Sequence, residues 1–274
     1  MKIIRKIIQR ISHGKVLKRT ITVSGKPTPL YVSPDAQLKY LKVGIKAFDH
    51  DLIQIAERFL EENSIVWDIG ANVGVFTFAS AAVASKGTIV AVEADIWLAS
   101  ILRKSARLKH YRNSDIRVLP VAMSEADGTA KFIIAAAGRA SNTLKSVYGG
   151  GRTQMGGTRE EQYVPTLRLD TLLTSMPKPD FIKIDVEGAE LMVIKGASRI
   201  TSEIRPVFYI EVGNEVSAKI FNLFAEQNYI AVSPEGEVLK GLCTFNTFFI
   251  PIENEKAQKY AGVLELVSNS SLVS

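Results

Sequence analysis

The sequence predicts an α/β fold built on one doubly wound, mostly parallel β-sheet, and three observations support this. Short apolar strand segments alternate with helical segments from about residue 48 onward, as in parallel sheets that carry helices on both faces. A glycine-rich turn, DIGANVG, follows the first of these strands. The last two strands, in YIAVSPEGEVL and TFNTFFIPI, have no helix between them, so we expect them to pair antiparallel as a hairpin at the sheet edge.

The composition fits one globular domain with a small appendage. Of the 274 residues, 46% are hydrophobic and 23% are charged, which is enough apolar material to bury one core. No apolar stretch approaches the ~20 residues needed to span a bilayer, and no cleavable signal peptide is evident. The single cysteine, Cys243, rules out an internal disulfide. We therefore expect a soluble, cytoplasmic protein.

The net charge of +6 does not by itself identify a partner. Basic proteins bind nucleic acids, anionic lipids or acidic substrates. Here much of the positive charge lies in the first fifty residues, without the interleaved aromatic residues of a nucleic-acid surface. The pattern argues against a nucleic-acid partner. The three histidines, His13, His50 and His110, are too scattered to form a histidine-rich metal site.

Residues 1–47 are predicted to form an N-terminal appendage. In residues 1–14, five isoleucines fall on one helical face, lysines and arginines fall on the other, and Gly14 is the expected stop. The apolar face of this basic amphipathic helix fits the body of the protein, a second subunit of a homo-oligomer, or a membrane surface. Packing on protein is favoured because so short a helix is marginal alone. Residues 20–43 are predicted to be extended, with a break at KPTP.

The main domain, residues 48–274, is predicted to begin with the helix FDHDLIQIAERFLEE, where Asp49 is the N-cap or first-turn acid. The predicted order is then strand IVWDIG, helix VGVFTFASAAVAS, strand GTIVAVEAD, helix IWLASILRKSARLKH, strands DIRVLPVAMS and TAKFIIAAA, strand FIKIDVEG, helix GAELMVIKGAS, strand RPVFYIEV, helix SAKIFNLFAEQN and the final two strands. Residues 138–162 interrupt this order with a loop that carries six glycines. Loops of this length are either disordered or functional lids.

The turn after the first strand predicts a ligand site, because ligands of doubly wound sheets bind outside the carboxyl ends of the strands. Gly70 and Gly74 permit close backbone approach, and Asn72 tolerates a left-handed conformation. Asp68, at the strand tip, disfavours a pyrophosphate and favours a cation such as the amino-acid part of S-adenosylmethionine. Its alternative role is to cap the following helix. Glu93 ends the next strand, where an acid can accept both hydroxyls of a ribose.

These motifs, together with FIKIDVEGAE and YIEVGNE, resemble the FkbM family of S-adenosylmethionine-dependent methyltransferases over about residues 48–250. The resemblance implies a class I methyltransferase fold, which is a Rossmann-like, doubly wound sheet of seven strands with an antiparallel C-terminal hairpin. It also implies methyl transfer from S-adenosyl-L-methionine, usually to a hydroxyl of a sugar, glycolipid or secondary metabolite. The acceptor would be a small molecule or saccharide. The first fifty residues and the glycine-rich loop lie outside the resemblance, so we expect them to select the acceptor.

The resemblance also assigns site residues by motif. The methionine part of the cofactor falls to the DIGANVG turn, the ribose to Glu93, and the adenine to Val121 and Ala122. The complete predicted cofactor-binding set is Asp68, Gly70, Ala71, Asn72, Gly74, Phe76, Thr77, Glu93, Ala94, Val121, Ala122 and Asp185. One position departs from the family pattern. Members often have a histidine two residues after the acid of the fifth strand, where this chain has Gly213, so any role of that histidine is missing here or has moved elsewhere.

Three acids at the ends of the fourth and fifth strands are the predicted catalytic residues: Asp185, Glu187 and Glu211. Methyl transfer to a hydroxyl needs an in-line approach and a group that accepts the hydroxyl proton. Crowded carboxylates raise one another's pKa, so one of them becomes a better base near neutral pH. Alternatively, they hold Mg²⁺. Glu190 is expected to face solvent or cap its helix, and Lys183 to pair with an acid.

Two other functions stay open at this point. The first is a nicotinamide-dependent oxidoreductase on the same Rossmann-like sheet, against which the glycine spacing and Asp68 argue. The second is a non-catalytic, cofactor-binding scaffold docked at a membrane through residues 1–14. The intact acids Asp185 and Glu211 argue against this scaffold.

Overall fold

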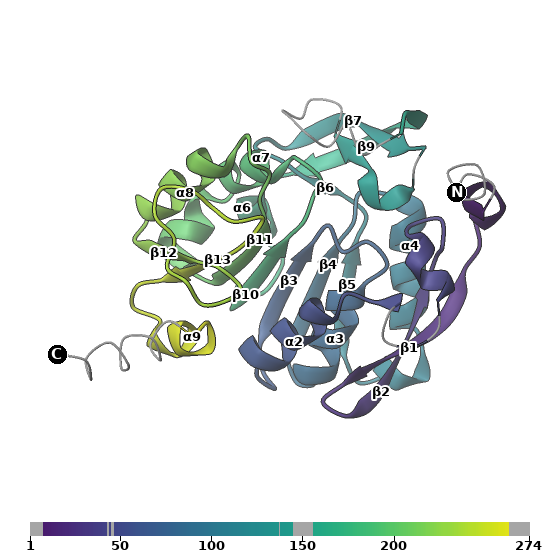
Figure 1. The fold of residues 1–274 in the computed structure, drawn as a ribbon, viewed down its shortest axis with the longest axis horizontal. Coiled ribbons are helices and arrows are strands. Elements are labelled where there is room, and N and C mark those ends of the chain that lie inside the picture. Colours follow the sequence, from purple (N-terminus) through teal and green to yellow (C-terminus); the bar gives the residue numbers. More distant parts are fainter. Residues whose placement is uncertain (1–7, 43, 45–46, 137, 145–155, 263–274) are drawn as a thin grey trace.

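The fold is organised around a seven-stranded sheet in the order β12-β13-β11-β10-β3-β4-β5 (Figure 1). The computed structural model describes residues 8–42, 44, 47–136, 138–144 and 156–262. The strands of this sheet are β3 (Ile65–Ile69), β4 (Thr88–Val92), β5 (Asp115–Leu119), β10 (Phe181–Ile184), β11 (Val207–Glu211), β12 (Tyr229–Val232) and β13 (Asn246–Pro251). All neighbouring pairs are parallel except those that involve β13, which runs antiparallel to both β11 and β12. The predicted doubly wound sheet and its C-terminal hairpin are therefore confirmed.

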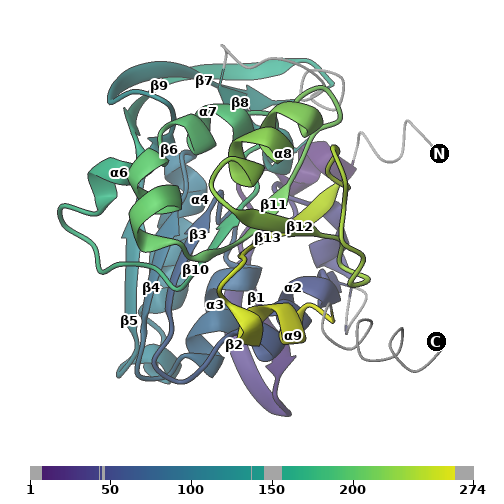
Figure 2. The ribbon, with the colours of Figure 1, turned by 90° about the vertical axis from the view of Figure 1, so that its left-hand side faces the viewer.

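Helices cover both faces of the sheet, because alternate strand residues point to opposite sides. In β3, Val66 belongs to one buried cluster and Trp67 to the other. The helices of the first face are α2 (His50–Phe59), α3 (Val75–Val83), α4 (Ile96–Ala106) and α9 (Glu255–Tyr260). Those of the second face are α6 (Leu169–Leu172), α7 (Glu190–Lys195), the π-helix η5 (Ile200–Ile204) and α8 (Ser217–Ala225). Figure 2 shows the two layers on either side of the strands.

The N-terminal segment forms an antiparallel hairpin of β1 (Leu17–Val23) and β2 (Lys26–Val32). The predicted break at KPTP is wrong, because these residues begin β2. Pro27 and Pro29 alternate, so both lack their N–H on the same edge of the strand. That edge faces away from β1, since the N–H of Tyr31 on it donates to Ser105 Oγ at 2.8 Å. The hairpin shares a buried cluster with α2, α3 and α4, and the proposed domain boundary at residue 47 stays a prediction.

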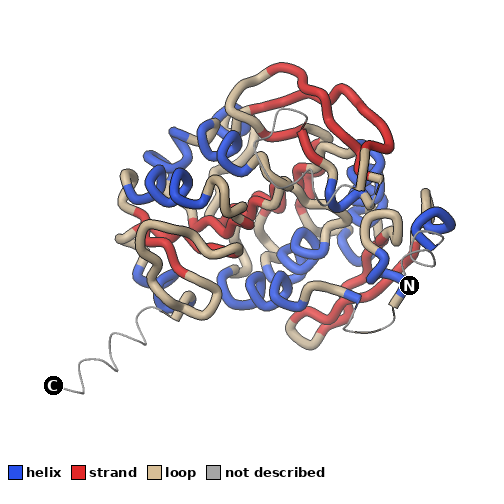
Figure 3. Tube along the Cα trace, turned by 45° about the horizontal axis from the view of Figure 1, so that its top comes forward, coloured by secondary structure: helices blue, strands red, loops and turns tan. Residues whose placement is uncertain are grey.

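A second, four-stranded sheet in the order β6-β9-β7-β8 lies beyond the carboxyl ends of the central strands (Figures 1 and 3). Its strands are β6 (Ala122–Met123), β7 (Gly128–Ala135), β8 (Thr143–Leu144) and β9 (Thr158–Leu167). The predicted single strand DIRVLPVAMS is wrong, because it divides at Pro120 into β5 and β6 of different sheets. The predicted loop 138–162 is also shorter than expected: it contains the 3₁₀ turn η4 (Arg139–Ser141), β8 and the start of β9. Residues 145–155 lie outside the described part of the chain.

At the start of the described chain the helix agrees with expectation, whereas the end carries a helix that was not predicted. Residues 8–12 are helical and Gly14 has φ of +70°, in line with the predicted stop. Ile8 and Ile11 are 39% and 60% exposed, whereas residues 1–7 of the predicted helix lie outside the description. At the other end, the short helix α9 follows the last strand and was not predicted. Two further 3₁₀ turns complete the elements, η1 (Leu38–Leu41) and η3 (Lys109–Tyr111). Within the described residues, no helix is long and apolar enough to cross a membrane.

The turn after β3 has the backbone that its sequence predicts. Gly70, Asn72 and Gly74 have φ values of +75°, +53° and +92°. The N–H of Gly70 donates to Val92 O at 2.9 Å, which joins the turn to the end of β4. A Cβ atom on Gly70 would lie 1.8 Å from Asp185 O. The turn and the end of β10 can therefore approach only because residue 70 has no side chain.

We predict that Gly70→Ala destabilises the protein more than Gly25→Ala. Both glycines have φ of +75°, but nothing lies within 4 Å of a Cβ on Gly25. The left-handed conformation costs an alanine about 1–2 kcal/mol at either site. The clash with Asp185 O adds a further ~1–3 kcal/mol at residue 70. Urea unfolding measures both variants, and equal losses of unfolding free energy would contradict the close contact.

Candidate functional site

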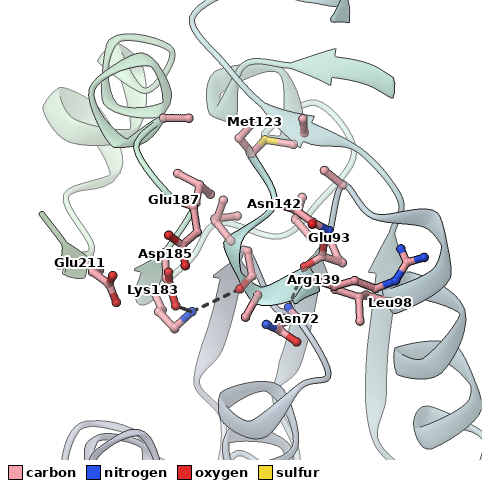
Figure 4. Close-up of a pocket in the computed structure, with 18 of the residues that line it drawn as sticks. Asn72, Glu93, Leu98, Met123, Arg139, Asn142, Lys183, Asp185, Glu187 and Glu211 are labelled. Carbon is pink, nitrogen blue, oxygen red and sulfur yellow. Dashed lines mark hydrogen bonds and ion pairs between the residues drawn. The ribbon is translucent and has the colours of Figure 1, made fainter. Parts of the chain in front are cut away.

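The carboxyl ends of the central strands open into a cavity of about 410 Å³ (Figure 4). Nine predicted site residues line it: Gly70, Asn72, Glu93, Ala94, Val121, Ala122, Asp185, Glu187 and Glu211. A small adjoining cavity of about 40 Å³ is lined by three more, Asp68, Ala71 and Phe76, together with Gly70, Asn72 and Asp185. The remaining two, Gly74 and Thr77, line neither of these cavities. Thr77 instead supports Asp68, whose Oδ2 accepts its hydroxyl at 2.5 Å.

Glu93 forms one end of the large cavity. Its side chain is held by two backbone donors, with Oε2 accepting from Asn72 N at 2.7 Å and Oε1 accepting from Asp95 N at 2.8 Å. Burial raises the pKa of Glu93 to about 7. Each carboxylate oxygen keeps lone pairs for further donors. The carboxylate is therefore fixed in a position to accept two hydroxyl groups from a ligand.

Beside Glu93 the cavity wall is apolar. Val121 and Ala122, which sequence reasoning singled out, line it together with Leu98 from the first turn of α4 and Met123 from β6. Figure 4 shows Leu98 and Met123 on the same side of the cavity as Glu93. Leu98 and Met123 were not predicted, although Met123 directly follows the predicted pair in the sequence. The apolar wall next to a hydroxyl acceptor suits a flat ring attached to a ribose.

Lys183 is the central cation of the site. Strand register places it opposite Asp68 of β3 and Tyr209 of β11 on the same face of the sheet. Its ammonium group lies 3.4 Å from Asp68 Oδ1, Asp185 Oδ2 and Gly70 O. Lys183 and Asp68 are 3% and 0% exposed. The expected pairing of Lys183 with an acid is therefore confirmed, and the charge of Asp68 already has a cation beside it before any ligand binds.

Asp185, Glu187 and Glu211 gather at the other end of the cavity (Figure 4). Burial, reinforced by the charge of Asp185, raises the pKa of both Glu187 and Glu211 to about 8. Glu187 has a left-handed backbone with φ of +52°, and its carbonyl accepts the hydroxyl of Thr143 at 2.8 Å. Such strained positions persist where the surrounding structure enforces them, often at functional sites. Because their pKa values are raised, Glu187 and Glu211 are, once ionised, stronger bases than an ordinary carboxylate.

Glu190 differs from expectation. Of its two expected roles, exposure to solvent is wrong, since Glu190 is 2% exposed, and capping of its helix stays a prediction. Its Oε1 accepts the N–H of Gly188 at 2.9 Å, so it fixes the loop that carries Glu187 from within. Burial raises the pKa of Glu190 as well. Its place behind the loop explains why it supports the acids without lining the cavity.

A buried polar network that the sequence did not reveal closes the side near Glu93. Asp95 caps α4, and its Oδ2 accepts from Asn142 Nδ2 at 2.8 Å and from the guanidinium of Arg139. Arg139 also donates to Asp35 Oδ2 at 3.2 Å and lies over the Trp97 ring, 4.7 Å from its centroid. The network joins the N-terminal segment and α4, at the cavity, to the four-stranded sheet β6-β9-β7-β8, which we call the inserted sheet. The hydrogen-bonded pairs of the network, Arg139 with Asp95, Asn142 with Asp95 and Arg139 with Asp35, are 44, 47 and 104 residues apart in the chain, and no local pattern signals such pairs.

The acids do not form a recognisable metal centre. Among the described residues, no group of three or more His, Cys, Asp or Glu side chains is arranged to hold a metal ion. Asp185 is also occupied by Lys183, a cation that already takes the place beside its carboxylate. The alternative role of these acids as Mg²⁺ ligands stays a prediction without support from this geometry.

Residues 68–231 match the family model described as the methyltransferase FkbM domain, which is more than half of the chain. The chain belongs to the FkbM methyltransferase family. None of the curated proteins compared with the chain matches it. The match begins at Asp68 and includes all predicted site residues, whereas the hairpin and α2 precede it.

Solved structures similar to this chain are distant. An FkbM methyltransferase from Methylobacillus flagellatus KT is 17% identical, with a TM-score of 0.42, and the match covers 69% of this chain and 44% of that one. The O-methyltransferase from Bacillus cereus in complex with SAH is 15% identical, with a TM-score of 0.42, and the match covers 78% of this chain and 87% of that one. An O-methyltransferase from Thermotoga maritima is 14% identical, with a TM-score of 0.42 and coverages of 84% and 76%.

We predict that Lys183→Met costs about 3–5 kcal/mol of unfolding free energy, because it leaves Asp68 as a buried, uncompensated charge. The double variant Asp68→Asn, Lys183→Met should recover part of this loss, since it removes both charges. Chemical denaturation provides the measurement.

Lys195→Met is the matched control, because Lys195 pairs with Glu125 at 3.3 Å on the surface, where both side chains are about half exposed. We expect it to lose at most ~1 kcal/mol. If Lys183→Met and Asp68→Asn were additive in the double variant, the two groups would not be coupled.

Proposed function

We propose that this member of the FkbM family is an S-adenosyl-L-methionine-dependent methyltransferase that methylates a hydroxyl group of a sugar, glycolipid or secondary metabolite. One observation supports it above the others: a single cavity has a fixed hydroxyl acceptor, Glu93, at one end and acids with raised pKa values at the other. The first end suits the nucleoside of the cofactor. The second suits deprotonation of a hydroxyl.

The residues present fit the cofactor. Glu93 would accept the two ribose hydroxyls, and Leu98, Val121, Ala122 and Met123 would contact the adenine. The methionine part would lie over the turn after β3, where Asn72 Oδ1 is buried without a hydrogen-bond partner in the described structure. An ammonium group is a donor that such an orphan acceptor needs. Asp68 is too enclosed by Thr77 and Lys183 to meet the cofactor as an open charge, so we assign it the support of this end of the cavity.

When bound, the cofactor would supply an activated methyl group to the hydroxyl oxygen of the acceptor, and its sulfur would keep the electron pair of the broken carbon–sulfur bond. The chain supplies position and a place for the proton. Glu187 is our choice of base, because its raised pKa makes it a good proton acceptor and its backbone is held in a constrained conformation. Asp185, held by Lys183, and Glu211 would complete the acidic end.

The nicotinamide alternative is less well supported by the same site. A dinucleotide would place its pyrophosphate on the turn after β3. There the carboxylates of Asp68 and Asp185 lie within 3.4 Å of one lysine, so the turn carries more negative than positive charge. The second alternative, a scaffold without catalysis, gives no role to the raised pKa values of Glu187 and Glu211.

We predict that the protein binds S-adenosylhomocysteine and that Glu93→Gln weakens this binding about 10–100-fold, because hydrogen bonds to a charged group contribute about 1.5–3 kcal/mol. Hydroxyl donors favour the ionised carboxylate. In the wild type, affinity should therefore rise with pH through about 7, the pKa of Glu93, and Glu93→Gln should lose this dependence. Isothermal titration calorimetry measures both effects. A folded wild type that binds NADH and not S-adenosylhomocysteine would overturn the proposal.

A second prediction concerns the acidic end. In carbon-13 NMR of carboxyl-labelled glutamate, two resonances should titrate near pH 8, from Glu187 and Glu211. Glu187→Gln should remove one of them and lower the pKa of Glu211, because the charge of Glu187 contributes to raising that pKa. The same variant should reduce the rate of methyl transfer about 10²–10⁴-fold. Above the wild-type pKa the base form predominates, so the wild-type rate should rise as pH passes about 8.

Glu160→Gln, an exposed change on β9, is the control and should leave both resonances in place. Titration of Glu187 at its ordinary pKa, or an unchanged rate in Glu187→Gln, would contradict the assignment of the base.

A further inference from the structure

A second cavity, of about 510 Å³, adjoins the first. Four residues line both: Gln37, Lys39, Ala140 and Glu187. Most of its wall comes from the N-terminal segment, namely Gln9, His13 and the run 34–39, and the rest from Ala136, Gly138, Ala140, Ser141 and Glu187. The N-terminal part lies outside the residues that match the family model. Glu187, the proposed base, therefore lines two cavities. Most of the wall of the second cavity comes from residues outside the family match.

Gln37 stands where the cavities meet, since it lines the large cavity, the second cavity and the small one. Its Oε1 is buried and has no hydrogen-bond partner among the described residues. A buried acceptor without a partner costs about 1–3 kcal/mol. A ligand hydroxyl that donates to this oxygen would remove that cost. Gln37 thus points to a donor group in the ligand, close to Glu187.

The charges around the second cavity are already engaged. Asp35 accepts from Arg159 at 2.8 Å, Arg139 at 3.2 Å and the N–H of Gly14 at 3.3 Å. Lys39, the permanent cation among the described lining residues, pairs with Asp49. An anionic ligand would find no free cation there and would meet Glu187. Among the described lining residues there is no Phe, Tyr or Trp, and the imidazole of His13 is the one aromatic ring, so a flat aromatic ligand would find little surface for stacking.

We propose that this second cavity binds the methyl acceptor, and that the acceptor is an uncharged, non-aromatic polyhydroxyl compound that donates a hydroxyl to Gln37 Oε1. This inference rests on the proposed function and adds the place and the chemistry of its acceptor. One hydroxyl would bind Gln37 while its neighbour lies beside Glu187, which receives the proton as the oxygen takes the methyl group. The N-terminal segment would then determine which acceptor is methylated.

The test uses the full chain saturated with S-adenosylhomocysteine and saturation-transfer NMR with methyl glycosides of glucose, mannose, galactose and rhamnose. We expect saturation transfer to at least one of these neutral glycosides, and less to methyl glucuronide and catechol. Gln37→Leu should weaken the transfer several-fold, while Gln37→Glu, which keeps an acceptor oxygen, should retain it. Gln54→Leu, an exposed change on α2, is the matched control for lost polarity.

A further variant tests the second cavity without changing a residue that lines the first cavity. Ala136 is exposed and lines the second cavity alone, so Ala136→Trp should fill it, abolish saturation transfer and leave the affinity for S-adenosylhomocysteine unchanged. Ala225→Trp, at an exposed position of α8, is its control.

The outcomes separate the two proposals. If the wild type does not bind S-adenosylhomocysteine, the proposed function fails and this inference fails with it. If it does bind, the inference alone is overturned by any of three results: no transfer to a neutral glycoside, transfer that persists in Ala136→Trp, or a preference for glucuronide or catechol.

Discussion

The site depends on the contacts of the buried ammonium group of Lys183. A lysine at 3% exposure is stable only beside compensating charge and acceptors. Asp68, Asp185 and the carbonyl of Gly70 provide them, each at 3.4 Å. Burial acts to lower the pKa of Lys183, but the charges of Asp185, Asp68 and Glu211 hold it above its usual range. Because the three partners come from the end of β3, the turn after it and the end of β10, the cation fixes the register and the turn together.

This arrangement also divides the acids of the cavity into different chemical types. Asp68 and Asp185 lie against the lysine, which stabilises their negative charge. Glu187 and Glu211 are half-buried near Asp185, and partial burial together with the charge of Asp185 raises their pKa values to about 8. Glu93 is fixed by two backbone donors and has a pKa of about 7. Carboxyl groups in one cavity can thus serve different tasks, since the environment of each decides whether it holds charge, binds hydroxyls or accepts a proton.

The sequence predicted the parts of this site whose signals are local. The turn DIGANVG can be recognised in the sequence because an acid, two glycines and an asparagine occur at close spacing at the end of one strand. The positive φ values of Gly70, Asn72 and Gly74 agree with this prediction. Glu187 and Glu211 could be placed because parallel strands end at the same edge of a sheet. The role of Asp68 was harder to predict, since its partner Lys183 is 115 residues away and only the register of β3 against β10 brings them together.

The polar network around Arg139 shows why the other parts were missed. Arg139 follows a glycine in a segment with little periodicity, and nothing near it in the chain indicates that it will be buried between Asp35 and Asp95. Similarly, KPTP has the composition of a break, but Pro27 and Pro29 are compatible with a strand when both point to an edge that β1 does not use. Local composition indicates which backbone conformation a segment prefers, whereas tertiary contacts determine where that segment lies in the fold.

The same network gives the N-terminal segment a physical connection to the site. Arg139 and Arg159 both bind Asp35, so the loop after the hairpin is held to the inserted sheet by charges that are largely removed from water. The hairpin itself contributes Ile21, Val23, Leu30 and Val32 to the core shared with α3 and α4. Gln37 lies two residues after the anchored Asp35. The contacts of the neighbouring residues therefore set its position where the cavities meet. Because the chain before residue 68 forms most of the wall of the second cavity, changes in that segment can alter this cavity without disturbing the carboxyl ends of the central strands.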